Sequence, residues 1–482
     1  MAGSRTGARE GRAVKILIRN AELEGRVVDV VVADGTVRTI VPADAADTAA
    51  AEMVVEAEYS ALIPGLHDHH LHLLALAATR RSFAAGPPLV RTSADLVAAI
   101  AGAATSPEGW LRGTGFHESV ADIDRWWIDD VVADRPVRIQ HRSGARWIVN
   151  SRALERIGVA ELPTRGVERD SKGRPTGRLT GLDAVLRDRW PSADPEPDLA
   201  RTSELLASFG VTGVTDATPY AHRGDFEPLV HGTRCGAIRQ RLTVMGAPGL
   251  DPDELTALGV TVGPAKIVVG DHDLPTLDEL TASIGLARAS GRCVAVHCVT
   301  RLALVLTLAA LDEVGVMRGD RIEHGAVVDP DAVAQLAARG LTVVTQPNFI
   351  AERGDEYLAN VDADDLPHLY PCGRLLDAGV AVAGSTDAPF GDPDPWAAMA
   401  AAVQRRSATG HVLGPAERIP GRRALDLFLG RPDSPGGLVR RVEVGAVADL
   451  VLLDRPLADV VVDLRATRVR ATFIGGQAVF RR

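Results

Sequence analysis

The 482-residue sequence predicts an α/β fold: a closed (β/α)8 barrel of the TIM type, with a small β-sandwich formed by the N- and C-terminal segments. Two observations support this prediction. Strand-like and amphipathic helical runs alternate through the second half of the chain, which is typical of parallel βαβ units. Short strands separated by turns occur at both ends of the chain, outside the alternating region.

The terminal segments predict the sandwich. Near the N-terminus, β-branched runs flank an Asp-Gly turn, which is a hairpin signal. Similar runs occur near the C-terminus, the last with a Gly-Gly turn. The runs are 14–18, 27–32, 36–40, 448–454 and 469–480. We expect residues 1–61 and 436–482 to form one β-sandwich and residues 62–435 to form the domain between them.

Residues of about 80–205 lack the alternating pattern, and we interpret them as an insertion in the barrel domain. Strand-like runs occur at 110–115 and 137–141, and the proline-rich segment 190–197 is interpreted as a linker.

Eight strands are predicted for the barrel: Leu62-Ile63, followed by 211–216, 241–245, 265–269, 293–297, 321–324, 341–346 and 380–384. The intervening helices have recognisable ends. Thr276 and Glu279 predict a capping box and Gly291 a helix end, and another helix is expected from Asp329-Pro330 to Gly340. Eight such units are the number that closes a barrel.

Charge and composition exclude several classes of protein. The net charge is −10 and no basic stripe suits a nucleic acid, while no apolar run approaches the ~18 residues that a membrane span needs. Four cysteines without a Cys-x-x-Cys pair are expected to be reduced thiols. We therefore expect a cytoplasmic enzyme that binds a small molecule, neither nucleic acid nor membrane, and that is compatible with a homo-oligomer.

The segment Leu62–Leu73 places four histidines within six positions. In an extended strand, alternate side chains share a face, so Asp68, His70 and His72 lie on one side. Two imidazoles at that spacing can bind one metal ion, most simply zinc, although iron, cobalt, nickel and manganese also fit. A solvated histidine-rich loop is the alternative interpretation.

Other reactive residues lie on or just after the predicted strands. In a barrel of this type, the carboxyl ends of the strands form the reactive face. The candidates beyond His70 and His72 are Lys266, His297, His324 and Asp387. Each alone has a structural explanation: a hydrogen-bonded core histidine, a turn aspartate, or an ion pair of Lys266 with Asp271 or Asp273. Together they predict a metal site.

This pattern resembles the amidohydrolase superfamily. The resemblance comes from Pro64–His72, one histidine on each of two later strands, an aspartate before Ala388-Pro389, and the segment 445–454. Arg321–His324 and Val149–Leu154 are similar to the branch that includes the N-substituted formamide deformylases.

The resemblance implies a role for each candidate. His70, His72 and Asp387 would bind a first divalent metal ion, His297 and His324 a second, and Lys266 would bridge the two if its amine were carboxylated. The number of ions, one or two, stays open. A metal-activated hydroxide would attack the substrate, with Asp387 as base and then acid. The reaction would hydrolyse a non-peptide, amide-type carbon–nitrogen bond of a small molecule.

Substrate contacts are expected from His141, Arg146 and Gln346, although ordinary loop roles are equally compatible. The chain departs from the branch at Gly144-Ala145 and after His297, where Cys298 follows. These departures leave the substrate open. A hydrolase of ureas, carbamates or thiocarbamates, a deaminase, and a non-catalytic barrel scaffold remain alternatives.

Overall fold

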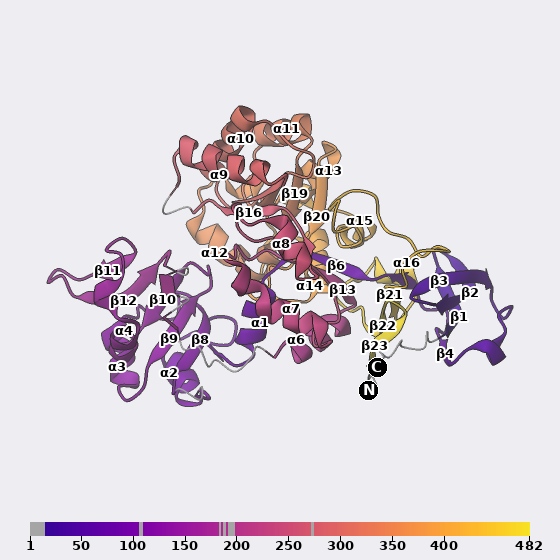
Figure 1. Ribbon diagram of the computed structural model, residues 1–482, viewed down its shortest axis with the longest axis horizontal. Coiled ribbons are helices and arrows are strands. Elements are labelled where there is room, and N and C mark those ends of the chain that lie inside the picture. The colour runs from indigo at the N-terminus through magenta and orange to yellow at the C-terminus, as the bar shows by residue number, and fades with distance from the viewer. Residues whose placement is uncertain (1–14, 106–108, 183–184, 187–188, 191–197, 271–273) are drawn as a thin grey trace, which may run out of the picture. The chain divides into compact units, whose positions relative to one another are not determined.

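The computed structural model (Figure 1) describes residues 15–105, 109–182, 185–186, 189–190, 198–270 and 274–482. The chain divides into two compact units, and each is described by itself. Unit 1 comprises the described residues within 1–71, 203–387 and 391–482. Unit 2 comprises those within 72–202 and 388–390. The predictions made for Val14, Asp271, Asp273 and linker residues 191–197 lie outside the described residues.

The two ends of the chain contribute to one β core in unit 1. One sheet has the order β3-β2-β1-β4 and the other β23-β22-β21-β5. Ile18 and Val30 of the first sheet pack in the same buried cluster as Leu452 and Phe473 of the second. The strands are β1 (Ile16–Leu23), β2 (Arg26–Ala33), β3 (Thr36–Pro42), β4 (Met53–Glu56), β5 (Leu62–Pro64), β21 (Leu450–Leu453), β22 (Val469–Ile474) and β23 (Gln477–Arg481).

The prediction that Leu62-Ile63 is the first barrel strand is wrong. β5 pairs antiparallel with β21, and the strand beside β13 is β6 (Leu66–Leu71). The change of sheet occurs at Pro64-Gly65, because proline cannot donate a ladder hydrogen bond. A Cβ at Gly65 would lie 2.1 Å from Thr212 Oγ1, so only glycine allows this close passage.

The remaining strands of unit 1 form two parallel sheets, β15-β14-β13-β6 and β16-β17-β18-β19-β20. β20 lies beside β6, and Asp387 N after β20 donates to His70 O at 2.9 Å. No ladder between described strands joins the two sheets, so barrel closure stays a prediction. The strands are β13 (Val211–Asp216), β14 (Arg241–Val244), β15 (Thr261–Val262), β16 (Ala265–Val268), β17 (Val294–Cys298), β18 (Arg321–His324), β19 (Thr342–Thr345) and β20 (Ala381–Gly384).

Helices follow most of these strands and begin and end at the expected signals. Thr276 accepts from Glu279 N in a capping box, and Gly340 ends its helix in the left-handed conformation at φ 62°. The helices and 3-10 turns are η1 (Thr48–Ala50), α6 (Leu199–Ser208), η3 (Arg223–Phe226), α7 (Glu227–Arg234), α8 (Pro252–Ala257), α9 (Leu277–Ala289), α10 (Arg301–Val314), α11 (Pro330–Arg339), α12 (Asn348–Asn360), η4 (Leu366–His368), α13 (Cys372–Asp377), α14 (Pro395–Gln404), η5 (Pro415–Glu417), α15 (Gly421–Asp426) and α16 (Leu457–Val460). None of the helices in the described part of the chain combines the length and apolar character that crossing a bilayer requires.

Unit 2 contains a six-stranded sheet of order β11-β12-β10-β9-β8-β7. Leu96, Ile128, Ile139 and Ile148 belong to its buried core. The elements are α1 (Leu73–Thr79), β7 (Phe83–Ala84), α2 (Ser93–Ala101), β8 (Leu111–Phe116), α3 (Arg125–Val131), β9 (Val137–His141), β10 (Arg146–Val149), α4 (Ser151–Ile157), η2 (Val159–Glu161), β11 (Val167–Arg169) and β12 (Pro175–Thr180).

A surface carboxylate on α12, that of Asp355, should make the free energy of unfolding depend on pH. Asp355 accepts hydrogen bonds from Ser407 Oγ, Thr409 N and Thr409 Oγ1, which lower its pKa to about 2. We expect Asp355→Asn to be less stable than the parent chain at pH 7. Because an unfolded aspartate titrates near pH ~4, the stability difference should shrink as the pH falls from about 4 to about 2. Chemical denaturation of both proteins across this range measures it, and a constant difference would contradict the assignment.

Candidate metal centre

β6 brings His70 into a buried group of candidate metal ligands. All six residues of β6 are buried. His70 Nε2 lies 3.4 Å from Lys266 Nζ and 3.5 Å from Asp387 Oδ1. Three residues that the sequence separates by up to 317 positions thus lie close together in unit 1. His72, the other predicted ligand of the first ion, is the first residue of unit 2, and its place in this group stays a prediction.

His297 and His324 extend this group. The ring centroids of His297 and His324 are 4.4 Å apart, and those of His324 and His70 are 4.9 Å apart. His324 Nδ1 lies 4.0 Å from Asp387 Oδ2, so the Asp387 carboxylate has one oxygen near each of two histidines. The structure therefore brings five of the six candidate ligands together in unit 1, while their division between one or two ions stays a prediction.

The backbone is unusual at two of these residues. His324 has φ 69° and Asp387 has φ 56°, the left-handed region that residues other than glycine rarely adopt. Such conformations cost on the order of 1–3 kcal/mol and persist where surrounding contacts impose them. His324 is the last residue of β18, and Asp387 lies three residues after the end of β20.

A buried ion pair fixes the orientation of His70. His70 Nδ1 contacts Glu323 Oε2, and Arg321 Nε donates to Glu323 Oε1 at 2.5 Å. Arg321 also donates to His69 O at 3.1 Å. Since a carboxylate only accepts, Nδ1 carries the proton and Nε2 keeps its lone pair for a ligand.

His324 has a neutral partner instead. Its Nδ1 lies 2.7 Å from Gln346 Oε1, and Gln346 Nε2 donates to Ser385 Oγ at 2.8 Å. Gln346 is fully buried. The predicted contact between Gln346 and a substrate stays a prediction.

Burial controls the protonation of the group. Burial lowers the pKa of His324 far below its usual value, helped by the neighbouring His297 and His70. Burial also lowers the pKa of Lys266, although Glu323 and Asp387 oppose the shift. Neutral imidazoles with a carboxylate are donors that suit a divalent ion, so the residues present fit a metal.

The other two predicted substrate contacts belong to unit 2. His141 Nε2 lies 3.0 Å from Glu118 Oε2, and Arg146 Nη1 pairs with Glu118 Oε1 at 3.1 Å. Glu118 therefore links both side chains. Their role in substrate binding stays a prediction.

The sequence analysis did not identify the residues that hold the candidate ligands in place by hydrogen bonds. Glu323 and Arg321 have the i, i+2 spacing that places two side chains on one face of a strand, and this charged pair in a buried strand was an available signal. Asp68 accepts from His70 N, Thr386 N and Thr386 Oγ1, and burial raises its pKa to about 7. Its partner Thr386 lies 318 positions further along the chain, and the sequence gives no signal of this contact.

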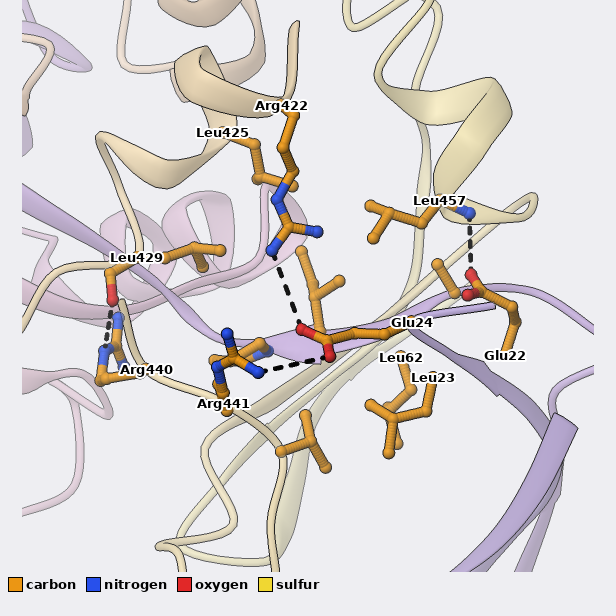
Figure 2. A pocket seen from close by; sticks show the side chains of 14 residues that line it. Glu22, Leu23, Glu24, Leu62, Arg422, Leu425, Leu429, Arg440, Arg441 and Leu457 are labelled. Carbon is orange, nitrogen blue, oxygen red and sulfur yellow. Dashed lines mark hydrogen bonds and ion pairs between the residues drawn. The ribbon is translucent and has the colours of Figure 1, made fainter. Parts of the chain in front are cut away.

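A small cavity in unit 1 lies apart from this group (Figure 2). Glu24 is paired there with Arg422 and Arg441 at 3.9 and 3.6 Å, and Leu457 N donates to Glu22 Oε2. The cavity volume is about 20 Å³, room for about one water molecule, and none of the six candidate ligands lines it. This cavity is therefore no substrate site.

Comparisons with known proteins agree with the geometry. The profile of the amidohydrolase family matches residues 53–480. N-substituted formamide deformylase of Arthrobacter pascens is 25% identical, over 89% of this chain and 90% of the relative. An uncharacterized metal-dependent hydrolase of Pyrococcus horikoshii OT3 superposes with a TM-score of 0.70 at 20% identity, covering 91% and 95% of the two chains. A mutant atrazine chlorohydrolase of Arthrobacter aurescens TC1, complexed with zinc and atraton, gives a TM-score of 0.56 at 14% identity, covering 97% and 95%. The predicted resemblance is confirmed.

The ion pair behind His70 should dominate the stability of the centre. Arg321→Met leaves the buried Glu323 carboxylate without its partner, so we expect the free energy of unfolding to fall by about 3–5 kcal/mol. The double variant Arg321→Met/Glu323→Gln should lose less, because no buried charge remains unpaired. Chemical denaturation in the presence of a chelator measures this without a contribution from metal. Equal losses in both variants would show that charge pairing is not the cause.

Proposed function

The chain belongs to the amidohydrolase family, and on this premise we propose that it is a metal-dependent hydrolase of a non-peptide carbon–nitrogen bond in a small molecule. One observation carries the proposal. Five side chains of unit 1 lie close together. His70 Nε2 is 3.5 Å from Asp387 Oδ1 and 3.4 Å from Lys266 Nζ, and the ring centroid of His324 lies 4.9 Å from that of His70 and 4.4 Å from that of His297.

The donor set supports one assignment of ligands. His70, His72 and Asp387 would hold a first ion, His297 and His324 a second, and carboxylated Lys266 would lie between them. Zinc is our proposal for the metal, supported by the nitrogen and oxygen donors. When bound, such an ion lowers the pKa of a coordinated water molecule and polarises the carbonyl group of a substrate.

Asp387 is suited to move the proton. Its two carboxylate oxygens lie 3.5 Å from His70 Nε2 and 4.0 Å from His324 Nδ1, so it is held beside both groups of histidines. We assign it to accept the proton of the attacking water and then to donate it to the departing nitrogen. A carbon–oxygen bond forms, the carbon–nitrogen bond breaks, and the nitrogen leaves as an amine.

The name of the Arthrobacter pascens relative makes N-substituted formamides the first substrate class to test. Ureas, carbamates and thiocarbamates are the alternative class, since the same nucleophile attacks their carbon, and deamination is another. A screen of metal-loaded protein against these classes distinguishes them. A non-catalytic scaffold is disfavoured because all six donor residues are present.

Three further parts of the interpretation are proposals. We place the two parallel sheets in one closed barrel, supported by the position of β20 beside β6. A cytoplasmic location is supported by the four free cysteines, Cys235, Cys293, Cys298 and Cys372. The partner is a small-molecule substrate, with no nucleic acid or membrane partner, and a homo-oligomer is compatible with this function.

Replacing the proposed base tests the function. We expect Asp387→Asn to lower kcat by about 10²–10⁴-fold with the fold retained, because an amide cannot carry the proton. Turnover of the substrate found in the screen, metal content and thermal unfolding are measured together. The exposed Asp331→Asn on α11 is the control and should keep full activity. Full activity of Asp387→Asn with bound metal would refute the role.

Carboxylation of Lys266 can be tested directly. Burial favours the neutral amine that reacts with carbon dioxide, and the lowered pKa of Lys266 supports this. Metal-loaded protein incubated with ¹³C-bicarbonate should show a carbamate signal by NMR that Lys266→Met abolishes. Lys172→Met, at an exposed position, should leave the signal unchanged. A signal that survives Lys266→Met would place the carbamate elsewhere.

A further inference from the structure

We propose that Gln346 is a positioning residue for His324: with Ser385 it keeps the proton on Nδ1 and thereby presents Nε2 of His324 as the metal donor. This inference rests on the proposed function, because it assigns a purpose to His324 as a ligand. It differs from the expected substrate contact of Gln346, since it needs no contact between this side chain and a substrate.

Three side chains from neighbouring strand ends form the contact chain. His324 ends β18, Gln346 follows β19, and Ser385 follows β20, all in unit 1. His324 Nδ1 lies 2.7 Å from Gln346 Oε1, and Gln346 Nε2 lies 2.8 Å from Ser385 Oγ. Gln346 and Ser385 are fully buried and His324 is 4% exposed, so water does not compete strongly for these groups.

The backbone oxygen of Thr345 sets the direction of the hydrogen bonds that link His324, Gln346 and Ser385. Ser385 Oγ donates to the backbone oxygen of Thr345 at 3.3 Å, and a carbonyl oxygen can only accept. The single hydroxyl proton of Ser385 is then committed, so Oγ accepts from the amide NH₂ of Gln346. The amide oxygen must therefore face His324, and Nδ1 of His324 must be the donor.

The opposite amide orientation would be incompatible with a metal site. If the NH₂ group of Gln346 faced His324, Nδ1 would accept and the proton would reside on Nε2. A protonated Nε2 has no lone pair for a metal ion. A neutral amide can adopt both orientations, whereas the Glu323 carboxylate beside His70 can only accept. Ser385 is thus needed at His324, whereas the carboxylate of Glu323 accepts from His70 and Arg321 without such a hydroxyl group.

A second buried glutamine in unit 1 provides a matched control. Gln240 Oε1 accepts from Ser203 Oγ at 2.7 Å, and its Nε2 donates to Ser203 O and Val211 O. Gln240 is also buried and also has a serine partner, and its described hydrogen bonds are to Ser203 and Val211. A purely structural role of a buried glutamine is therefore represented by Gln240.

The test measures metal affinity and tautomer rather than turnover. The full-length metal-free protein is titrated with Zn²⁺ in competition with a chromophoric chelator, and with Co²⁺ followed by visible absorption. We expect Gln346→Met to lower the affinity for the ion that His324 would hold by about 10–100-fold, which is the usual effect of removing a partner of a ligating histidine. Gln346→Glu, which can only accept, should restore most of the affinity. Gln240→Met should lower stability and leave affinity unchanged.

Histidine ¹⁵N NMR reports the tautomer directly. In the metal-free parent protein, the signals of His324, assigned with His324→Asn, should show protonated Nδ1, and this preference should weaken in Gln346→Met. Unchanged affinity and unchanged tautomer in Gln346→Met would overturn the proposal. If Gln346→Met does not fold, Ser385→Ala takes its place and should show a smaller loss of affinity and a mixed tautomer; wild-type values in that variant would overturn the proposal equally.

The two proposals fail in different ways. If the parent protein binds neither Zn²⁺ nor Co²⁺, the proposed function is refuted, and the tautomer measurement alone then decides the role of Gln346. If the parent protein binds metal and the Gln346 variants bind it equally well with the same tautomer, the proposed function stands and the positioning role is refuted.

Discussion

The buried contact between Glu323 and His70 is the interaction on which the rest of the centre depends. Arg321 donates to Glu323 at 2.5 Å and to the backbone oxygen of His69 at 3.1 Å, so the ion pair closes a loop around His70. Removing two charges from water costs several kcal/mol per ion, and a buried pair rarely repays this fully. Its contribution here is to orient a side chain, because Glu323 on β18 fixes the ring of His70 on β6.

Hydrogen bonds also hold the segment after β20 close to β6. Asp68, on β6, accepts from Thr386 N at 3.2 Å and from His70 N at 3.1 Å, while Asp387 N donates to His70 O at 2.9 Å. The segment after β20 is therefore held to β6 by both side-chain and backbone hydrogen bonds. Asp387 can adopt its left-handed φ of 56° because these contacts hold Thr386 and the backbone N–H of Asp387.

The sequence predicted which reactive side chains lie close together in unit 1 better than it predicted the residues that hold them. Ligating residue types are rare and chemically distinctive, and the alternation of a strand places His70 beside Asp68 without knowledge of the fold. The role of Glu323 was not predicted, because a charged residue near Arg321 is equally compatible with an exposed face of a strand. The role of Gln346 depends on Ser385, 39 positions away, and on the hydrogen that Thr345 accepts. Leu62-Ile63 was misassigned because an apolar pair indicates burial and not which of two adjacent sheets receives it.

Charge balance connects the remaining features. Burial lowers the pKa of His324 far below its usual value and raises the pKa of Asp68 to about 7. Two further carboxylates, Asp387 and Glu323, face the single guanidinium of Arg321, while burial favours the neutral amine of Lys266. Carboxylation of this amine adds a negative charge and leaves an excess of two negative charges in a buried site. One divalent cation neutralises this excess, and an isolated buried charge is costly. Metal binding and carboxylation of Lys266 should therefore stabilise each other, and the neutral Gln346 beside His324 adds no charge that would disturb this balance.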